Sequence, residues 1–339
     1  MSRDEGTARP HPRGDESSSE VPGAGARVLA VVGPTAVGKT ALAEGLALRL
    51  GGEIVSADSM QVYRGMDVGT AKPRPDERAV PYHCIDLAEP GEPFSAALYQ
   101  DCARAAVADI SARGLLPVLA GGTGLYVRAA IDDLEFPRGE SGSRERERLE
   151  ALAARIGPEA LHERLRGIDP ASAALIHPNN VRRVVRALEM AAEGVSYAEQ
   201  ARGFAERRAV YDATFLGLTM EREALYARIG ERVEAMVAAG LLDEVRALLD
   251  AGYREALTAA QAIGYKELVP VAEGRADLGD AVEAVKLATR RYAKRQLTWF
   301  RADPRVRWVD ATGLAPGGVL AQALALLESG RRGGTVERG

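Results

Sequence analysis

Eight residues near the start of the chain have the types and spacing of a phosphate-binding loop. They read GPTAVGKT, fit the pattern G-x-x-x-x-G-K-[ST], and lie between an apolar run and a helical segment. The glycines let the backbone curl so that its N–H groups point inward, toward phosphate oxygens. Lys39 would reach the outer phosphate, and the hydroxyl of Thr40 would ligate Mg²⁺. The motif predicts a diphosphate or triphosphate site formed by Gly33, Pro34, Thr35, Ala36, Val37, Gly38, Lys39 and Thr40.

Two later segments supply polar groups that could face this loop. Nucleotide-hydrolysing and kinase P-loop proteins usually carry an aspartate at the end of an apolar strand, but the apolar run 116–120 is followed by GGTG. Thr123 and its neighbouring N–H groups could form a second anion-facing loop, although these residues also suit a plain turn. The carboxylate that could face the phosphate loop is Asp58, which could equally cap a turn or a helix.

Short strands that alternate with helices must position these groups. Apolar runs predict strands at 28–32, 53–57, about 82–87, 116–120 and 211–218. Helical periodicity predicts helices through about residue 50 and at 95–113, 221–239, 241–251, 261–273 and 279–302. Alternation of this kind indicates parallel βαβ units. The fold class is therefore α/β, with a P-loop NTPase-like parallel sheet flanked by helices.

A segment without strands interrupts this pattern. Residues 138–205 are rich in Arg, Glu and Ala, and Asn179-Asn180 is a plausible cap before VRRVVRALEM. We expect an all-helical insertion domain there, within an α/β core at 27–137 and 206–327 that ends in C-terminal helices. The polar termini, 1–26 and 328–339, are expected to be disordered tails.

Composition narrows the class of protein. The chain has 339 residues, of which 46% are hydrophobic and 27% charged, as is typical of a globular protein with about two domains. Two cysteines and four scattered histidines argue against a disulfide framework or a zinc site. The longest apolar run is far shorter than a membrane helix needs, and no secretory signal is visible. We expect a cytoplasmic protein with no membrane partner.

Positive charge is concentrated near the end of the chain. The net charge of −4 argues against bulk nucleic-acid binding, but residues 286–307 contain eight Lys or Arg and one acid. On a helix, Lys286, Arg290 and Lys294 would form a basic stripe with Arg291 and Arg295 beside it. Interleaved aromatic and amide side chains come from Tyr292, Gln296 and Trp299. This pattern favours nucleic-acid contact, and a solvated helix face is the alternative.

Six segments taken together resemble one family, the bacterial tRNA dimethylallyltransferases (tRNA isopentenyltransferases). They are GPTAVGKT at 33–40, DSMQVYRGMDVGTAKP at 58–73, GGTGLY at 121–126, HPNNVRRVVRALE at 177–189, QAIGYKEL at 261–268 and TRRYAKRQLTWFR at 289–301. The resemblance spans roughly residues 27–310. The chain departs from it in a 26-residue N-terminal extension, and it lacks the C-terminal zinc finger of the eukaryotic form.

The resemblance implies a transfer reaction. The dimethylallyl group of dimethylallyl diphosphate would move to N6 of adenosine 37 of tRNA, immediately 3′ of the anticodon, in tRNAs that read codons starting with U. Diphosphate would leave. The implied cofactor is Mg²⁺, the implied partners are the tRNA anticodon stem–loop and the isoprenoid donor, and the expected state is a monomer. A phosphate loop usually associated with ATP would here hold a diphosphate.

The resemblance also implies roles for individual residues. Asp58 would orient the adenine amine and accept its proton, Thr123 would donate a hydrogen bond to the bridging oxygen or the diphosphate, and Arg228 would be a second diphosphate clamp. The insertion would grip the anticodon stem–loop. The residues expected at tRNA are Asp58, Ser59, Met60, Gln61, Arg146, Arg182, Arg183, Arg186, Arg290, Arg291, Lys294 and Arg295.

Three other functions share some of these features. A nucleoside or small-metabolite kinase would have the same strand, phosphate loop and helix, and would consume ATP. An adenylate isopentenyltransferase would perform the same chemistry on free AMP or ATP. A non-catalytic RNA-binding module would leave the phosphate loop unexplained. The basic stripe and the large insertion favour a polymeric acceptor.

Overall fold

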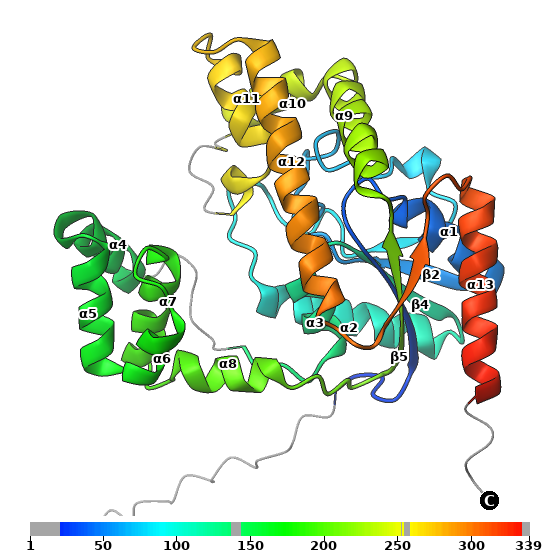
Figure 1. Cartoon of the computed structure of the whole chain (residues 1–339), viewed down its shortest axis with the longest axis horizontal. Helices are drawn as coiled ribbons and strands as arrows, with labels where there is room; N and C mark the ends of the chain where they lie inside the picture. The colour runs from blue at the N-terminus through cyan, green and yellow to red at the C-terminus, as the bar shows by residue number, and fades with distance from the viewer. Residues whose placement is uncertain (1–20, 137–143, 252, 254–257, 334–339) are drawn as a thin grey trace, which may run out of the picture.

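The computed structural model describes residues 21–136, 144–251, 253 and 258–333. Its centre is a six-stranded sheet with the order β3-β2-β4-β1-β5-β6, in which neighbouring strands run parallel. Figure 1 shows helices on both sides of this sheet. The predicted parallel α/β fold is confirmed. The strands are β1 (Arg27–Val32), β2 (Gly52–Ser56), β3 (Tyr82–His83), β4 (Leu116–Gly121), β5 (Asp212–Thr219) and β6 (Val306–Asp310).

Both faces of the sheet are buried. The core helices are α1 (Lys39–Leu50), α2 (Ala96–Ala112), α3 (Gly124–Ile131), α9 (Arg222–Ala238), α10 (Leu241–Asp250), α11 (Tyr265–Ala272), α12 (Leu278–Arg301) and α13 (Pro316–Gly333). In β1, Val28, Ala30 and Val32 pack into one hydrophobic cluster with α2 and α3, whereas Leu29 and Val31 pack into another with α1 and α13. A strand buried on both faces is apolar throughout, which is why its sequence is recognisable.

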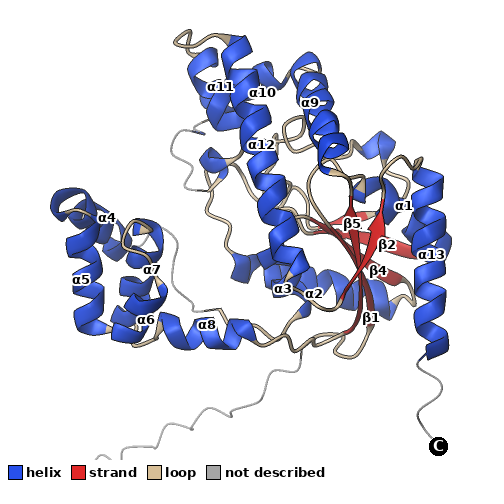
Figure 2. Ribbon diagram, in the orientation of Figure 1, coloured by secondary structure: helices blue, strands red, loops and turns tan. Residues whose placement is uncertain are grey.

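The inserted helices form a group of their own. Figure 2 shows them beside the core, with no strand among them. Their hydrophobic cluster includes Leu149, Leu161, Leu165, Val184 and Leu188, all buried. Asn180 caps the fourth of these helices, as predicted, and its side chain accepts a hydrogen bond from the Arg183 N–H. The helices are α4 (Arg144–Ile156), α5 (Pro158–Ile168), α6 (Pro170–Leu175), α7 (Val181–Ala192) and α8 (Tyr197–Ala205).

A buried ionic network anchors the two connections between this group and the core. Arg128, on α3, donates hydrogen bonds to the backbone oxygens of Phe204 and Glu206, at the end of α8. The same guanidinium pairs with Asp132, which is fully buried. Arg305, just before β6, reaches the second oxygen of this carboxylate at 2.6 Å. The outgoing and returning segments are therefore tied to one another and to the sheet edge.

The structure differs from the sequence expectations in its last strand and at its ends. The structure has a strand, β6, at 306–310, where the sequence predicts none. Its sequence VRWVD mixes apolar residues with arginine, because β6 forms the edge of the sheet and is only partly buried. Residues 328–333, expected as tail, continue helix α13. Residues 21–26, also expected as tail, pack on the core, where the Gly25 N–H donates to the Val210 oxygen at 2.9 Å. Residues 1–20, 137–143 and 334–339 lie outside the described residues.

Two other elements begin or end at residues with positive φ angles. The strand expected near 82–87 ends at His83, because Cys84 and Asp86 have positive φ angles of 60° and 54°. The helix expected from residue 261 begins at Tyr265, after Gly264 with φ 96°. In the part of the chain that the structure describes, no helix is long and apolar enough to cross a membrane.

Candidate active site

Three loops meet at the carboxyl edge of the sheet. The phosphate loop follows β1, Asp58 follows β2, and Thr123 follows β4, which lies between the other two strands. The Thr123 N–H donates to the Ala57 oxygen at 3.1 Å, and the Ser59 N–H donates to the Thr123 hydroxyl at 3.0 Å. The structure therefore brings together the phosphate loop, Asp58 and Thr123, which the sequence places far apart.

The phosphate loop has the backbone that its glycines allow. Gly33 and Gly38 have φ angles of 146° and 101°, and a Cβ at Gly33 would lie 2.6 Å from the Leu218 oxygen. The Lys39 Nζ donates to the Pro34 oxygen across the loop at 2.7 Å. Burial, and then the nearby Arg232 guanidinium, lower the pKa of Lys39 to about 7, which Asp58 partly opposes. The loop thus gathers positive charge around a small cavity.

Two arginines of α9 face this loop. Arg228 reaches within 4.0 Å of the position that a Cβ at Gly38 would take, and it lines a 490 Å³ hollow beside the loop. Arg232, one turn later, lines the same hollow and also a 90 Å³ cavity with Lys39 and Asp58. The structure thus places the predicted Arg228 near the phosphate loop. Sequence reasoning missed Arg232, although its i+4 spacing from Arg228 was a usable signal.

Helix α12 packs across the phosphate loop and the GGTG loop. The buried amide of Gln296 accepts from the Thr35 N–H at 2.8 Å and donates to the Gly122 oxygen at 2.9 Å. It therefore joins the phosphate loop to the GGTG loop. Burial raises the pKa of Tyr292 to about 12, and the Asp58 charge adds to this effect. Both side chains line the 90 Å³ cavity.

The GGTG loop, which is expected to face an anion, is shaped by close packing with its neighbours. A Cβ at Gly121 would lie 2.2 Å from the Ala57 oxygen, and one at Gly122 would lie 2.0 Å from the Gln296 amide nitrogen. The Thr123 N–H, expected to face an anion, already donates to Ala57. The glycines are needed because β2 and α12 approach the loop closely.

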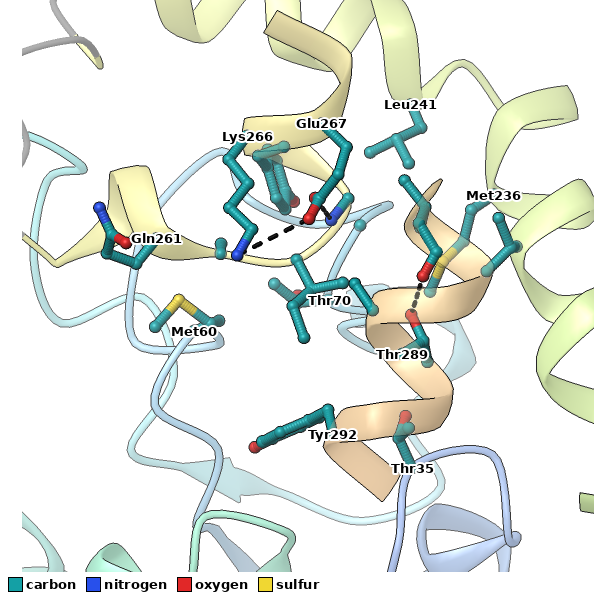
Figure 3. A pocket seen from close by; sticks show the side chains of 18 of the residues that line it. Thr35, Met60, Thr70, Met236, Leu241, Gln261, Lys266, Glu267, Thr289 and Tyr292 are labelled. Carbon is teal, nitrogen blue, oxygen red and sulfur yellow. Dashed lines mark hydrogen bonds and ion pairs between the residues drawn. The ribbon is translucent and has the colours of Figure 1, made fainter. Parts of the chain in front are cut away.

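A larger pocket of about 580 Å³ adjoins the 90 Å³ cavity lined by Lys39 and Asp58, which we call the phosphate cavity. Figure 3 shows Thr35 and Tyr292 at one end of it and Lys266 with Glu267 at the other. Of the residues expected at tRNA, it is lined by Asp58, Ser59, Met60, Arg291 and Arg295. Asp58 lines both this pocket and the phosphate cavity, so one carboxylate faces two spaces. Its Oδ1 also accepts from the Met60 N–H at 2.9 Å.

Gln61 lies elsewhere than expected. Its amide oxygen accepts from the Ser56 hydroxyl at 2.8 Å, and its amide nitrogen donates to the Thr70 oxygen at 3.3 Å. It lines the 90 Å³ phosphate cavity, away from the larger pocket where a base could enter. The physical reason is that these two hydrogen bonds hold the amide between the end of β2 and Thr70.

Glu244 of α10 holds the segment that forms one wall of the pocket. Its carboxylate accepts hydrogen bonds from the N–H groups of Asp67, Val68 and Gly69, at 2.8–3.1 Å, and from the Tyr265 hydroxyl at 2.6 Å. A Cβ at Gly69 would lie 2.4 Å from the Tyr265 ring. Sequence reasoning did not single out Glu244, because the N–H groups that it accepts from lie about 175 residues away.

The expected basic stripe of α12 is divided between two faces. Lys286 pairs with Glu234 of α9 at 2.8 Å, and Arg290 packs half-buried over the Tyr226 ring, 5.5 Å from its centroid. Arg290 was expected at tRNA, but the structure turns it toward α9, because i, i+4 spacing fixes a common face and not its direction. Arg291, Lys294 and Arg295 are the exposed basic residues of this stripe.

The basic residues of the insertion are also divided. Arg182 and Arg183, at the start of α7, are exposed. Arg146 and Arg186 pair with the buried Glu189, at 3.2 and 3.6 Å. Burial raises the pKa of Glu189, and the two arginines oppose this. The Arg146 pair therefore joins α4 to α7, and the Arg186 pair lies within α7, whereas both arginines are expected to contact RNA.

The expected Mg²⁺ ligand, Thr40, lies at the first turn of α1 and lines both the hollow and the phosphate cavity. Among the described residues, no group of three or more His, Cys, Asp or Glu is arranged to hold a metal ion. A hydroxyl and the Asp58 carboxylate on one small cavity fit Mg²⁺, which binds through few protein oxygens and completes its shell with phosphates and water.

Comparisons with known proteins agree on one family. A family model described as IPP transferase matches residues 61–303, and one described as isopentenyl transferase matches residues 26–80. The tRNA dimethylallyltransferase of Geobacillus thermodenitrificans (strain NG80-2) is 54% identical over 288 residues, which cover 84% of this chain and 91% of that protein. The protein of the same name from Symbiobacterium thermophilum is 53% identical over 289 residues, covering 84% and 90%.

Solved structures give the same result. The full-length tRNA isopentenylpyrophosphate transferase of Bacillus halodurans is 45% identical, with a TM-score of 0.66, and the match covers 89% of this chain and 96% of that one. A eukaryotic dimethylallyltransferase acting on tRNA is 29% identical, with a TM-score of 0.75, and the match covers 89% and 78%.

Proposed function

The chain belongs to the IPP transferase family and prenylates tRNA, and on that premise we propose its donor, its acceptor atom and its mechanism. The dimethylallyl group of dimethylallyl diphosphate moves to N6 of adenosine 37, in tRNAs that read codons starting with U, and diphosphate leaves. The observation that carries this proposal is the position of Asp58 between two cavities, one lined by the phosphate loop and one large enough for a base.

The phosphate loop binds the leaving group. Breaking the allylic C–O bond builds negative charge on the diphosphate and positive charge on the allyl group. Lys39 and Arg232 line the 90 Å³ cavity, and both line the adjoining hollow together with Arg228, so cationic side chains lie where that negative charge develops. One unit-charge contact at 4 Å contributes about 4 kcal/mol at an effective dielectric of 20. The Thr123 hydroxyl lies next to Asp58, because it accepts from the Ser59 N–H and donates to the Ser59 hydroxyl at 3.3 Å, and with substrate bound it would donate to the bridging oxygen instead.

Mg²⁺ would be held by Thr40 and the diphosphate oxygens, with Asp58 across the cavity. When bound, it neutralises charge on the diphosphate and so favours its departure. The protein contribution is to supply one hydroxyl ligand and a rigid loop that fixes the diphosphate beside it.

Asp58 acts on the acceptor. The exocyclic amine of adenine is a weak nucleophile, and a carboxylate that accepts a hydrogen bond from its N–H orients it and takes the proton as the new N–C bond forms. The second Asp58 oxygen is available for this, since Oδ1 is engaged with Met60. A base in a stacked loop cannot reach this depth, so adenosine 37 must be flipped into the 580 Å³ pocket.

The RNA backbone binds to exposed arginines and lysine on two sides. Arg291, Lys294 and Arg295 lie on α12, and Arg182 and Arg183 lie on α7, which Figure 1 shows on the side of the insertion nearer the core. An anticodon stem–loop between these helices would contact both. We also propose that the enzyme acts as a monomer in the cytoplasm, where its tRNA substrate is found.

The test is a comparison of donors and acceptors with purified protein. Dimethylallyl diphosphate with tRNA should give prenylated adenosine by nucleoside mass spectrometry, and ATP should not be consumed. Free AMP should be a poor acceptor. Asp58→Asn should abolish transfer while tRNA binding persists. Consumption of ATP with no prenylated tRNA would refute the proposal, and efficient prenylation of AMP would assign the acceptor to free nucleotides.

A further inference from the structure

An exposed tryptophan lies at the rim of the site. Trp299, in the last two turns of α12, is 45% exposed. The chain has one other tryptophan, Trp308 on β6, which is half-buried. Burying an indole is strongly favourable, so a tryptophan that is left exposed beside an active site is an unusual use of that residue.

The indole is fixed at one edge. A Cβ at Gly124 would lie 2.1 Å from the Trp299 Nε1 and 2.2 Å from its Cδ1, so the ring rests directly on the backbone of the GGTG loop. Gly124 follows Thr123, whose hydroxyl accepts the Ser59 N–H next to Asp58. Helices α12 and α3 are in contact at this point, as Figure 1 also shows. The ring is therefore held beside the GGTG loop, one turn of α12 beyond Arg295, which lines the 580 Å³ pocket, and the residue is partly open to solvent.

The surroundings of the ring are basic. Arg291, Arg295 and Trp299 follow one another at i, i+4 and i+8, so they lie along one face of α12, and all three are exposed. Arg291 and Arg295 line the 580 Å³ pocket. Arg301 is exposed within the same turn of the helix as the indole. A flat apolar surface flanked by guanidinium groups suits an unpaired nucleobase, whereas an apolar protein partner would leave these charges buried and unpaired.

We propose that the Trp299 indole is a stacking platform for an unpaired nucleobase of the anticodon loop that adjoins the flipped adenosine. Flipping a base breaks its stack with both neighbours. A fixed aromatic ring next to the pocket replaces that lost stack for one neighbour, and so stabilises the flipped state. This inference rests on the proposed function, because it requires a single-stranded RNA acceptor.

The first test measures substrate binding and turnover of Trp299→Ala and Trp299→Phe. Loss of one base–aromatic stack should raise the KM for tRNA, or its Kd, about tenfold in Trp299→Ala, with the KM for dimethylallyl diphosphate unchanged. Trp299→Phe should recover most of the loss. Leu98→Ala, which removes an exposed apolar side chain on α2 (48% exposed), is the matched control and should behave like the wild type. Equal thermal stability of the variants would show that folding is intact.

The second test pairs the protein change with an RNA change. Two anticodon stem–loops each carry one abasic site, on one side or the other of the target adenosine. One of them should bind the wild type more weakly than the intact RNA does. That RNA and the intact RNA should bind Trp299→Ala with equal affinity. In a Trp308→Phe background, Trp299 is the remaining tryptophan, and its fluorescence should be quenched by the intact stem–loop.

The outcomes separate this inference from the function. If the wild type prenylates RNA but Trp299→Ala matches it in KM and shows no coupling to an abasic site, the stacking platform is refuted and the function stands. If Trp299→Phe is as impaired as Trp299→Ala, the indole acts through some property other than its aromatic face, and the inference also fails. If the wild type prenylates no RNA, the proposed function itself fails.

Discussion

At the scale of single residues, charge balance around the phosphate cavity sets the chemistry. Lys39 and Arg232 repel one another, and Asp58 attracts both. The cavity therefore holds an excess of positive charge that an entering diphosphate relieves. Asp58 supplies part of the counter-charge, and it also faces the acceptor pocket.

The protonation of Lys39 predicts a pH dependence. Its pKa is lowered to about 7, so the free enzyme loses this positive charge as pH rises through that value. We expect kcat/KM for dimethylallyl diphosphate to fall about tenfold per pH unit above that point, because kcat/KM reports groups of the free enzyme. The bound diphosphate raises the pKa of Lys39. The pH profile of kcat, measured at saturating donor, should therefore lack this alkaline limb (the fall in rate above pH about 7).

Replacement of Lys39 tests whether this lysine causes the alkaline limb of the kcat/KM profile. Lys39→Ala should lower kcat/KM by about 10²–10³ and remove the alkaline limb from the profile. Measured profiles of wild type and variant over pH 6–9, about the range in which the change falls, provide the comparison. A limb that persists unchanged in Lys39→Ala would assign it to another group.

At the scale of elements, the loops at the sheet edge form one side of the site, and helices α9, α10 and α12 form the other. Gln296 joins two loops of the sheet edge, and Glu244 fixes the segment 67–69 from outside. These contacts mean that the pocket walls are held by side-chain hydrogen bonds between distant segments. Loss of one of these side chains should therefore affect substrate binding as well as stability.

Glu244→Ala should weaken the pocket wall. The N–H groups of Asp67, Val68 and Gly69 and the Tyr265 hydroxyl would lose their acceptor. We expect a loss of about 1–3 kcal/mol in the free energy of unfolding in urea, together with a raised KM for tRNA. Glu244→Gln keeps one carbonyl oxygen as an acceptor and should lie between the wild type and Glu244→Ala. No change in either quantity would mean that the segment is held by its other contacts.

The network that anchors the insertion makes a second prediction at this scale. Asp132 is fully buried and balances Arg128 and Arg305. Asp132→Ala should lower the free energy of unfolding by about 3–5 kcal/mol, because it leaves the buried Arg128 guanidinium without its carboxylate, whereas Arg305 keeps Asp303 at 2.7 Å. Denaturant unfolding measures this cost. Glu163→Ala, at an exposed ion pair on α5, is the control and should change stability by less than about 1 kcal/mol.

At the scale of the whole molecule, the net charge of −4 does not show which basic side chains are exposed and which are paired. Exposed basic residues lie on α12 and on α7, whereas Lys286, Arg290, Arg146 and Arg186 are engaged with other helices or with Glu189. Of these two groups, the first is exposed and can contact an RNA backbone. The sum of charges therefore says little about nucleic-acid binding, and their distribution says more.

The salt dependence of tRNA binding tests this distribution. Five phosphate contacts with a slope of about −0.7 each predict a loss of about 10² in affinity between 50 and 200 mM salt. The five contacts would come from Arg182, Arg183, Arg291, Lys294 and Arg295. Removing one of them, as in Arg295→Gln, should make the slope shallower by about 0.7. Lys286→Gln is the matched control, since Lys286 faces α9, and it should leave the slope unchanged.

The sequence by itself determined the parts of this protein that are local. The phosphate loop, the doubly buried strands, the Asn180 cap and the helical insertion follow from short patterns, because glycine conformation, side-chain alternation and capping act within a few residues. It also placed Asp58 and Thr123 after strands. Parallel strands end at one edge of a sheet, so side chains that follow them meet there.

Only the tertiary structure decided which surfaces face each other. Thr35 and Gln296 are 261 positions apart, and no local pattern indicates that they are hydrogen-bonded. The same holds for Arg232 at the phosphate cavity, Glu244 at segment 67–69, and the half of the α12 stripe that faces α9. Helical periodicity fixes which residues share a face, but the neighbouring elements determine whether that face is buried, paired or open to a ligand.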